Sequence, residues 1–305
     1  MKNKQGKNSK LELDADLNMN AIIKENSLQL IEVGSFLQKK HIARVKNAKG
    51  DCFILKAGRI EPFQVELLKT AKKIESQLCF KVPVIVKQGD GWILMKEIEG
   101  KFLNDFYKER PEWCADVCKK IADDYKLVIQ EIQKEKSFGN LLGDGQEWFF
   151  SKLDLWSKPI VDTGLIDFSE VQEIKKECEA IISKKRESFF SWVHGNIIGD
   201  HIIISGKDVY LLDLNAVPRI GGEYYDFLRA LDFMFLKAKD NEKIFSLISE
   251  LMKRYLSEFD EDEVKLVFAF RSIGMLGWDI IHNKDECGNI EEKKQLALKL
   301  IKRKY

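Results

Sequence analysis

The pattern of apolar and polar positions changes about a third of the way along the chain. Before residue 100, short apolar runs alternate with turns, whereas after residue 104 apolar residues recur mainly three and four positions apart. The elements expected in the first part are strands over 28–33, 42–45 and 52–56, a helix that begins at Pro62, and a hairpin formed by 82–86 and 92–98. The first part is therefore predicted to be a small antiparallel sheet with one helix.

The second part is predicted to be mainly helical, with one hairpin. A helix that opens at Pro111 has an apolar stripe ending at Ile132, the pattern of a helix that faces a core. Further helices are expected around 148–156 and over 171–182, 224–236, 244–255, 264–281 and from there to 305, with a hairpin over 202–213. We therefore expect an α+β chain with a flexible tail over 1–20, an N-terminal lobe over 21–100 and a larger, mainly helical C-terminal lobe over 101–305.

Composition narrows the class of partner. The chain has 305 residues, with 50 basic and 49 acidic residues, so no global field draws in nucleic acid or an anionic membrane. No run approaches the roughly 20 apolar residues of a membrane span, and the first 20 residues lack the apolar stretch of a secretory signal. The six cysteines form no C-x-x-C pair. We therefore expect reduced thiols, a cytoplasmic protein, and neither nucleic acid nor membrane as a partner.

Four residues have the chemistry that phosphoryl transfer needs. That reaction requires a lysine on the phosphates, a carboxylate that holds the lysine, acidic metal ligands and a group that orients the incoming hydroxyl. Lys56 ends an apolar strand, Glu66 lies one turn into the next helix, and Asp213 follows the apolar strand 209–212. Glu66 falls on the helix face that it shares with Leu67 and Ile74, so it is expected to point where apolar residues point. Taken singly, the lysine is more often solvated, the aspartate more often a cap, and His194 more often structural than catalytic.

A longer motif changes this interpretation. Residues 192–201 read WVHGNIIGDH, and the hairpin after them ends in LDLN at 212–215. These segments resemble the H-G-D-x-x-x-x-N catalytic loop and the I-D-[FW]-[DEN] metal segment of the aminoglycoside phosphotransferase and choline kinase family. Segments similar to its lysine strand, glutamate helix and hinge are found, in the same order, at 54–56, 63–66 and 92–100. The resemblance extends over residues 28–285 and implies a two-lobed, protein-kinase-like fold.

The resemblance also implies a role for individual residues. Those implied to bind ATP are Lys56, Glu66, Met95, Glu97 and Ile98. Those implied to hold Mg²⁺ are Asp213 and His201. Those implied to be catalytic are Asn196 and His194. Asp226 lies in a segment similar to the family's Y-D-L-A and is expected to be structural.

The loop departs from the family pattern at its two most important positions. Asn196 stands where the family has aspartate, and an amide cannot take up a proton, a function that contributes about 10²–10⁴-fold to such steps. His201 stands where the family has asparagine, and Mg²⁺ prefers oxygen to nitrogen. Asp200 lies near the wrong end of the loop to replace the base, and the glycine-rich loop at 34–40 has one glycine.

Three readings follow from these observations. The first is an ATP-dependent phosphotransferase of reduced activity that acts on a hydroxyl of a small molecule. The second is an inactive pseudokinase that binds nucleotide or a protein partner as a scaffold or regulator. The third is a helical domain unrelated to kinases, in which the motif residues are structural.

Overall fold

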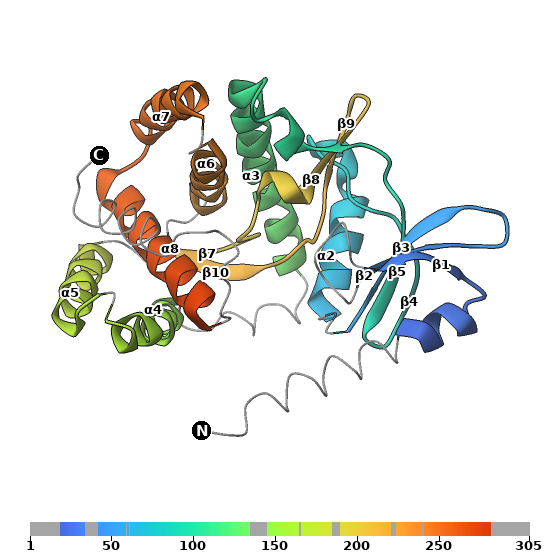
Figure 1. The fold of residues 1–305 in the computed structure, drawn as a ribbon, viewed down its shortest axis with the longest axis horizontal. Coiled ribbons are helices and arrows are strands. Elements are labelled where there is room, and N and C mark those ends of the chain that lie inside the picture. The colour runs from blue at the N-terminus through green and yellow to red at the C-terminus, as the bar shows by residue number, and fades with distance from the viewer. Residues whose placement is uncertain are drawn as a thin grey trace. The chain divides into compact units, whose positions relative to one another are not determined.

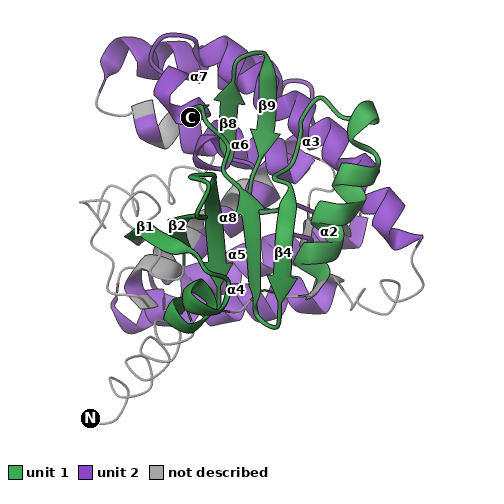
Figure 2. Ribbon diagram, turned by 90° about the vertical axis from the view of Figure 1, so that its right-hand side faces the viewer, with its two compact units in different colours: residues 1–102, 202–214 green, residues 103–201, 215–305 purple. Residues whose placement is uncertain are grey.

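The structure, a computed structural model, describes residues 19–33, 42–58, 60, 62–134, 145–164, 166–184, 190–220, 224–238 and 241–281. The chain divides into two compact units, which Figure 2 distinguishes by colour. Unit 1 contains residues 1–102 and 202–214, and unit 2 contains residues 103–201 and 215–305. The predicted α+β class is confirmed, because unit 1 is built on a sheet and unit 2 mainly on helices (Figure 1).

The largest element of unit 1 is a five-stranded antiparallel sheet. In spatial order its strands are β1 (Gln29–Val33), β2 (Ile42–Lys46), β3 (Cys52–Ala57), β5 (Trp92–Lys96) and β4 (Ile85–Gly89). Helix α2 (Pro62–Lys73) follows β3, with a proline at the first position, where a missing N–H is tolerated. These elements match the predicted positions to within a few residues, because alternation and turn residues mark them clearly in the sequence.

A short helical segment packs against this sheet. Residues 19–25 are helical, and Met19 and Ile22 are buried together with the strand residues Val45 and Leu55. The flexible tail was predicted to extend to residue 20, but the structure shows Met19 already packed in a hydrophobic core. The rest of that tail, residues 1–18, lies outside the described residues.

A three-stranded sheet joins the predicted 202–213 hairpin to unit 1. Its strands are, in order, β6 (Lys101–Phe102), β8 (Ile202–Ser205) and β9 (Asp208–Leu211). The Lys81 N–H donates to the Val209 carbonyl at 2.7 Å, and the Leu211 N–H donates to the Lys81 carbonyl at 2.9 Å. The predicted N-terminal lobe ends at residue 100, whereas unit 1 also contains residues 202–214. The difference arises because these long-range strand pairs attach the hairpin to unit 1.

Helices form most of unit 2. They are α3 (Pro111–Gln133), α4 (Gly145–Asp162), α5 (Phe168–Lys184), α6 (Tyr225–Ala238), α7 (Glu242–Leu256) and α8 (Glu261–Ile281). Asn241 caps α7, since its side-chain oxygen accepts a hydrogen bond from the Ile244 N–H at 3.2 Å. The helices lie where the sequence predicts them, and the charged helix expected to run to Tyr305 lies outside the described residues. No helix in the described part of the chain has the length and apolar character needed to cross a membrane.

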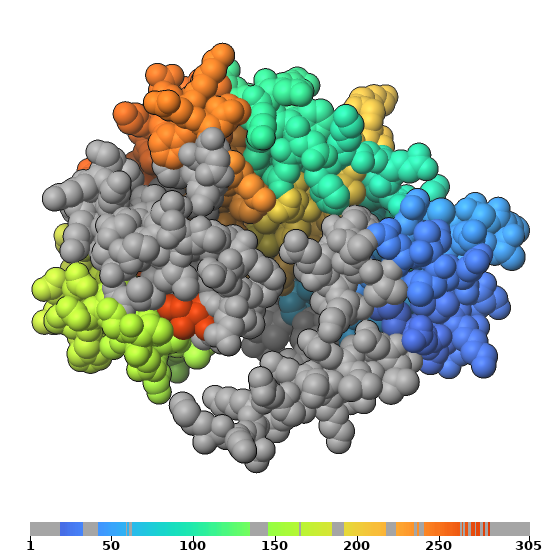
Figure 3. All heavy atoms as spheres, viewed as in Figure 1, coloured from blue at the N-terminus to red at the C-terminus, as the bar shows by residue number. Residues whose placement is uncertain are grey.

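The helices of unit 2 enclose an aromatic core. The rings of Phe149 and Phe270, from α4 and α8, stack with centroids 4.7 Å apart, and the Trp156 centroid lies 5.0 Å from that of Phe270. Figure 3 shows α3 and α7 side by side, and the Tyr255 hydroxyl of α7 donates to the Asp116 carboxylate of α3. The apolar stripe predicted for α3 is buried, so unit 2 has the packed core that its helical pattern predicts.

A two-stranded sheet in unit 2 fixes the start of the candidate catalytic loop. Strand β7 (Phe190–Val193) pairs antiparallel with β10 (Val217–Ile220), with Val193 opposite Val217. The loop begins at the residue that follows β7 and ends in the 3-10 turn η5 (Gly199–His201). The two ends of the loop are thus fixed by backbone structure.

Candidate active site

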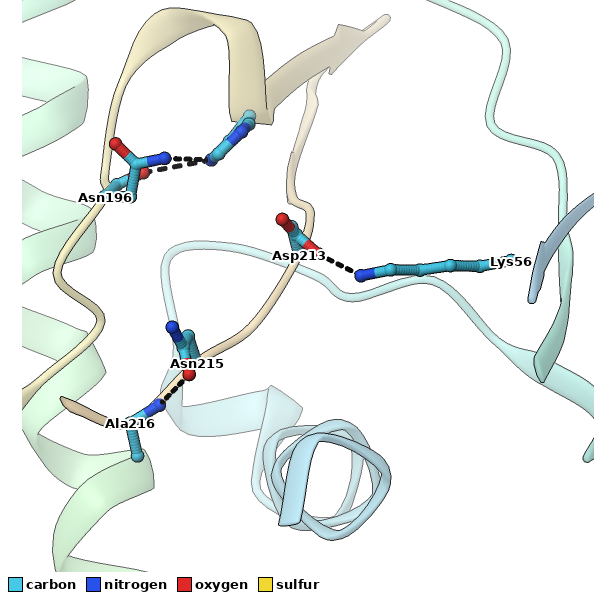
Figure 4. A network of polar contacts seen from close by, with 6 residues as sticks. Lys56, Asn196, Asp213, Asn215 and Ala216 are labelled. Atoms are coloured by element: carbon cyan, nitrogen blue, oxygen red, sulfur yellow. Dashed lines mark hydrogen bonds and ion pairs between the residues drawn. The ribbon is translucent and has the colours of Figure 1, made fainter. Parts of the chain in front are cut away.

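In unit 1, Lys56 forms an ion pair with Asp213 (Figure 4). Lys56 lies on β3 between Leu55 and Ala57, which are buried, so the alternation of a strand directs the lysine to the opposite face. Its Nζ donates to Oδ1 of Asp213. The two side chains are 16% and 31% exposed, so this pair is screened from solvent more than a surface pair is.

Asp213 is held in an uncommon backbone conformation. It follows β9 by two residues and has a φ of 54°, in the left-handed region that side chains other than glycine, asparagine and aspartate rarely adopt. The strand before it is fixed by its pairing with β8 and by the backbone of Lys81. Aspartate tolerates this conformation better than most residues, and here it places the carboxylate at the end of a firmly held strand.

The predicted ion pair between Lys56 and Glu66 is wrong for the described structure. Glu66 is 58% exposed and pairs with Lys69 at 2.9 Å, one turn along α2. The buried face of α2 contains Leu68 and Ala71, and Glu66 lies two residues before Leu68, about 200° around the helix. The carboxylate therefore faces away from the side of α2 that packs in the core.

The predicted hinge residues follow β5. Met95 lies in that strand, and both Glu97 and Ile98 come directly after its end and are partly buried. The carboxylate of Glu97 pairs with the Arg44 guanidinium at 2.9 Å, which raises the pKa of Arg44 through a side-chain hydrogen bond and its charge. The side chain of Glu97 is thus part of the scaffold, and any contact of this segment with adenine would come from its backbone.

In unit 2, Asp226 organises the start of the catalytic loop. Its carboxylate accepts hydrogen bonds from the His194 N–H at 2.8 Å and the Gly195 N–H at 2.7 Å. Gly195 has a φ of 79°, a conformation that strongly favours glycine. The structural role expected for Asp226 agrees with these contacts, which fix the loop where it leaves β7.

His194 lies inside unit 2. It is 1% exposed, its ring centroid lies 5.0 Å from that of Tyr125, and its Nδ1 accepts a hydrogen bond from the Asn196 N–H at 3.3 Å. Because Nδ1 is an acceptor, the ring is in the tautomer that carries its proton on Nε2. These contacts make His194 a positioning residue for the loop rather than a group that touches substrate.

The orientation of the Asn196 amide is determined by Arg229 on α6. The Arg229 Nε–H donates to Oδ1 of Asn196 at 3.3 Å, and an arginine nitrogen can only donate, so the amide oxygen must face it. The amide nitrogen therefore points the other way, toward the ring of His201, whose Nδ1 lies 3.4 Å from it. At this position the loop presents a hydrogen-bond donor where the family presents an acidic acceptor.

His201 is held by the backbone of Asn196. Its Nδ1 lies 3.0 Å from the Asn196 carbonyl, which can only accept, so Nδ1 carries the proton and Nε2 the lone pair. Among the described residues no group of three or more His, Cys, Asp or Glu side chains could hold a metal ion. Asp213 is thus the residue here that fits Mg²⁺, an ion that proteins often hold through one or two carboxylates together with substrate phosphates.

The end of the loop is fixed by very close packing. The Gly199 N–H donates to the Tyr107 hydroxyl at 3.0 Å, and a Cβ at Gly199 would lie 2.1 Å from Oδ1 of Asn104. The other side of the Asn104 amide donates to the carboxylate of Asp200. Asp200 is thus exposed and engaged away from Asn196, in line with its exclusion as a replacement base.

Sequence reasoning missed Arg229, Tyr107 and Asn104. Arg229 follows Asp226 by three residues on α6, and residues three apart lie on one face of a helix. Since Asp226 was expected to be structural in the kinase-like arrangement, this spacing was a usable signal for Arg229. No comparable sequence signal marked Tyr107 and Asn104, because their contacts join residues more than 90 positions apart. The predicted glycine-rich loop at 34–40 lies outside the described residues.

The structure is similar to solved structures of small-molecule kinases. An ethanolamine kinase from Plasmodium vivax is 14% identical, with 92% of this chain and 84% of that chain covered at a TM-score of 0.53. The choline kinase LicA from Streptococcus pneumoniae is 13% identical, with coverage of 94% and 99% and a TM-score of 0.54. A streptomycin–ATP ternary complex of APH(2'')-IIa is 14% identical, with coverage of 99% of both chains and a TM-score of 0.52.

The chain has the fold of these kinases. No protein-family model matches the sequence, and no curated protein matches it significantly. The kinase-like fold implied by the motif at 192–201 is therefore confirmed by structural similarity, at a level of sequence identity that shows the fold and leaves the reaction to be argued from the residues. This fold excludes the third interpretation, a helical domain unrelated to kinases.

Proposed function

We propose that the chain is an ATP-dependent small-molecule phosphotransferase whose activity toward a hydroxyl acceptor is low. The observation that carries this proposal is the pair of Lys56 and Asp213 on the kinase-like fold. Two oppositely charged residues 157 positions apart, each at the position expected for its role, form one partly buried pair.

Unit 1 would bind the nucleotide. Lys56 would neutralise the phosphates, and Asp213 would hold Mg²⁺, which when bound supplies charge neutralisation between the phosphates. The segment of Met95, Glu97 and Ile98 would hold the adenine through backbone groups. APH(2'')-IIa, which has the same fold, binds ATP in its streptomycin complex, which supports ATP as the nucleotide here.

Unit 2 would orient the acceptor. Asn196 can hydrogen-bond an acceptor but cannot take its proton, so catalysis would rely on positioning and charge stabilisation. Loss of proton acceptance lowers the rate with a hydroxyl acceptor by about 10²–10⁴-fold. We therefore propose slow turnover with alcohols rather than the absence of nucleotide chemistry.

The test is metal-dependent formation of ADP from ATP, in the presence of choline, ethanolamine or streptomycin and in their absence. We expect slow formation that requires Mg²⁺ and is abolished in Asp213→Ala. The matched control is Asp90→Ala, which removes an exposed carboxylate of the β4–β5 turn and should leave the rate unchanged. Equal rates for Asp213→Ala and the wild type would contradict the proposal.

A pseudokinase is the second candidate, and the contacts between Asn196 and His201 favour it. These two residues replace an aspartate and an asparagine of the family loop, and they lie against one another instead of presenting a carboxylate and an amide oxygen. A pseudokinase would bind ATP and form no ADP with any acceptor. Its function would then depend on a protein partner.

A further inference from the structure

In unit 2 the Asn196 amide contacts the first of three linked charged residues, Arg229, Asp232 and Arg271. On α6, Arg229 donates to Asn196, and Asp232 lies three residues further along the same helix. Arg271 on α8 donates to Oδ2 of Asp232 through Nε at 3.1 Å and Nη2 at 2.8 Å. Oδ2 of Asp232 thus accepts both hydrogen bonds from Arg271, and the same oxygen forms a longer ion pair with Nη1 of Arg229 at 3.8 Å.

Arg229 therefore has no carboxylate as a hydrogen-bond partner among the described residues. Its Nε donates to the neutral amide of Asn196, and its Nη1 is a buried atom with no hydrogen-bond partner in the part of the chain that the structure describes. Burial, followed by the charge of Arg271, lowers the pKa of Arg229 to about 10, so the guanidinium still carries its charge at neutral pH. Asp232 lies within ion-pair distance of Nη1 at 3.8 Å, but no hydrogen bond to Nη1 forms, so the hydrogen bonding of this guanidinium is incomplete.

The carboxylates around the loop are all engaged elsewhere. Both oxygens of Asp226 accept backbone N–H groups, Asp200 accepts from Asn104, and Asp232 is bound by Arg271. At position 196 the loop therefore presents an amide nitrogen beside a guanidinium, and both groups can only donate hydrogen bonds. Donors of this kind suit an oxygen that already carries negative charge.

We propose that the acceptor of this phosphotransferase attacks with an oxygen that is already ionised, a carboxylate or a phosphate, that the Asn196 amide nitrogen donates to this oxyanion, and that Arg229 orients the amide and adds positive charge beside it. The inference rests on the proposed function and specifies its acceptor. It removes the conflict between a kinase-like site and the lost aspartate, since an ionised acceptor has no proton to give up. Asn196 then acts as a donor suited to its substrate, and the change from aspartate also removes a repulsive charge.

The step is balanced without a base. One acceptor oxygen forms a bond to the γ-phosphorus of ATP while the bond from that phosphorus to the β,γ-bridging oxygen breaks, and the bond's electron pair leaves with ADP. The products are ADP and an acyl phosphate or a phosphoanhydride. No proton is transferred in the bond-making step.

Oxyanion binding is tested by calorimetric titration with methyl phosphate and with acetate. The parent protein for the titrations is Lys56→Met, so that anions are not bound by the lysine of unit 1. We expect Arg229→Met in this background to weaken binding by about tenfold or more, because the variant removes the nearby positive charge and the contact that orients the Asn196 amide. Arg254→Met removes a guanidinium of the same size from the exposed end of α7 and should leave binding unchanged.

Two further variants separate ligand binding from a merely structural role. Arg229→Lys keeps the charge and should retain part of the affinity. Asn196→Asp places a carboxylate beside Arg229 and should weaken anion binding by about tenfold or more, since the carboxylate then satisfies the guanidinium. The melting temperature of Arg229→Met should equal or exceed that of its parent, because the variant removes a poorly compensated buried charge.

The possible outcomes decide between the alternatives. Binding of methyl phosphate alone identifies a phosphate acceptor, and binding of acetate as well identifies a carboxylate. The inference is wrong if the parent binds neither probe, or if Arg229→Met binds them as tightly as the parent does. Titration of the wild-type chain with ATP tests the proposed function separately, so ATP binding without anion binding would overturn this inference alone.

Discussion

At the scale of single residues, the account depends on which groups meet in unit 1. The sequence marks Lys56 and Asp213 by residue type and by their positions at strand ends. It does not show which carboxylate the lysine meets, because that depends on the side of α2 that faces inward. The structure pairs Lys56 with Asp213 and turns Glu66 toward Lys69. The lysine is thus paired with the aspartate that we propose as the metal ligand rather than with the glutamate of α2.

We predict that Lys56→Met weakens ATP binding by about ten- to a hundredfold, since charge-assisted hydrogen bonds contribute about 1.5–3 kcal/mol each. Calorimetric titration of ATP measures the effect. The control, Lys69→Met, removes an exposed lysine of α2 that pairs with Glu66 and should leave ATP binding unchanged. A Lys56→Met protein that binds ATP as the wild type does would show that the lysine has no contact with the phosphates.

The thiol of Cys114 provides a residue-scale prediction about pH. Burial raises the pKa of Cys114 from 9.0 to about 12. Because the folded state keeps the proton and the unfolded state loses it, the group contributes stability that is present below pH 9 and is lost as the pH rises toward 12. We expect the free energy of unfolding, measured with urea, to fall progressively over this range, and less steeply in Cys114→Ala. Equal slopes for both proteins would contradict the shift.

The same burial predicts which thiols react. Cys79 is exposed, whereas Cys114, Cys118 and Cys178 are buried. We expect iodoacetamide at pH 8 to label Cys79 in the native protein and the three buried cysteines only after unfolding, because the thiolate is the reactive form. Peptide mapping by mass spectrometry distinguishes the sites. Rapid native labelling of Cys118 would mean that α3 is not packed as described.

At the scale of elements, the catalytic loop is held at both ends. Its first residues donate backbone hydrogen bonds to the Asp226 carboxylate, and its last turn packs against Tyr107 and Asn104. Asn196 lies between these anchors and is oriented by Arg229. Loop geometry is thus determined by α6 and by the segment before α3, neither of which is adjacent to it in sequence.

Asp226→Asn should loosen the first anchor. An amide provides one acceptor where the carboxylate provides two, so one of the His194 and Gly195 N–H groups loses its partner, at a cost of about 1–3 kcal/mol. We expect a lower melting temperature, measured by calorimetry, and faster hydrogen exchange at these two amides, measured by mass spectrometry. Unchanged exchange would show that the loop is held by other contacts.

Gly199→Ala should disturb the second anchor. An added Cβ would lie 2.1 Å from Oδ1 of Asn104 and 2.4 Å from the Tyr107 hydroxyl, and overpacking of this kind costs about 1–3 kcal/mol. Removal of the hydroxyl in Tyr107→Phe should relieve part of the clash. In a double-mutant cycle of thermal stability, we therefore expect the combined variant to be more stable than the sum of the single effects, and strict additivity would contradict the close contact.

The elements of this fold were predictable from sequence to a large extent, and their pairings were not. Period-two alternation located β3, helical spacing located α3, and Pro62 and Pro111 marked helix starts, because these signals are local. The attachment of β8 and β9 to unit 1 and the outward direction of Glu66 depend on long-range packing. The motif at 192–201 located the catalytic loop, yet Arg229, which orients its central residue, came only from the structure.

At the scale of the whole molecule, the kinase-like fold and the altered loop support one account. The fold extends over at least 92% of this chain in the three comparisons, so the altered residues lie within a complete scaffold of this type. The nucleotide side, represented by Lys56 and Asp213, keeps its charged residues. The side that we propose to bind the acceptor has an asparagine at position 196, where the resembled family has an acid, and presents a donor there. We infer that the chain retains nucleotide binding and has changed its acceptor.

The central claim is that unit 1 binds ATP with a metal ion held by Asp213. Calorimetric titration of the wild-type chain with ATP, with and without Mg²⁺, tests it most directly. We predict binding that is strengthened by Mg²⁺, with this strengthening lost in Asp213→Ala and kept in Asp90→Ala. If ATP does not bind the wild type under either condition, or if Asp213→Ala responds to Mg²⁺ as the wild type does, the account is wrong.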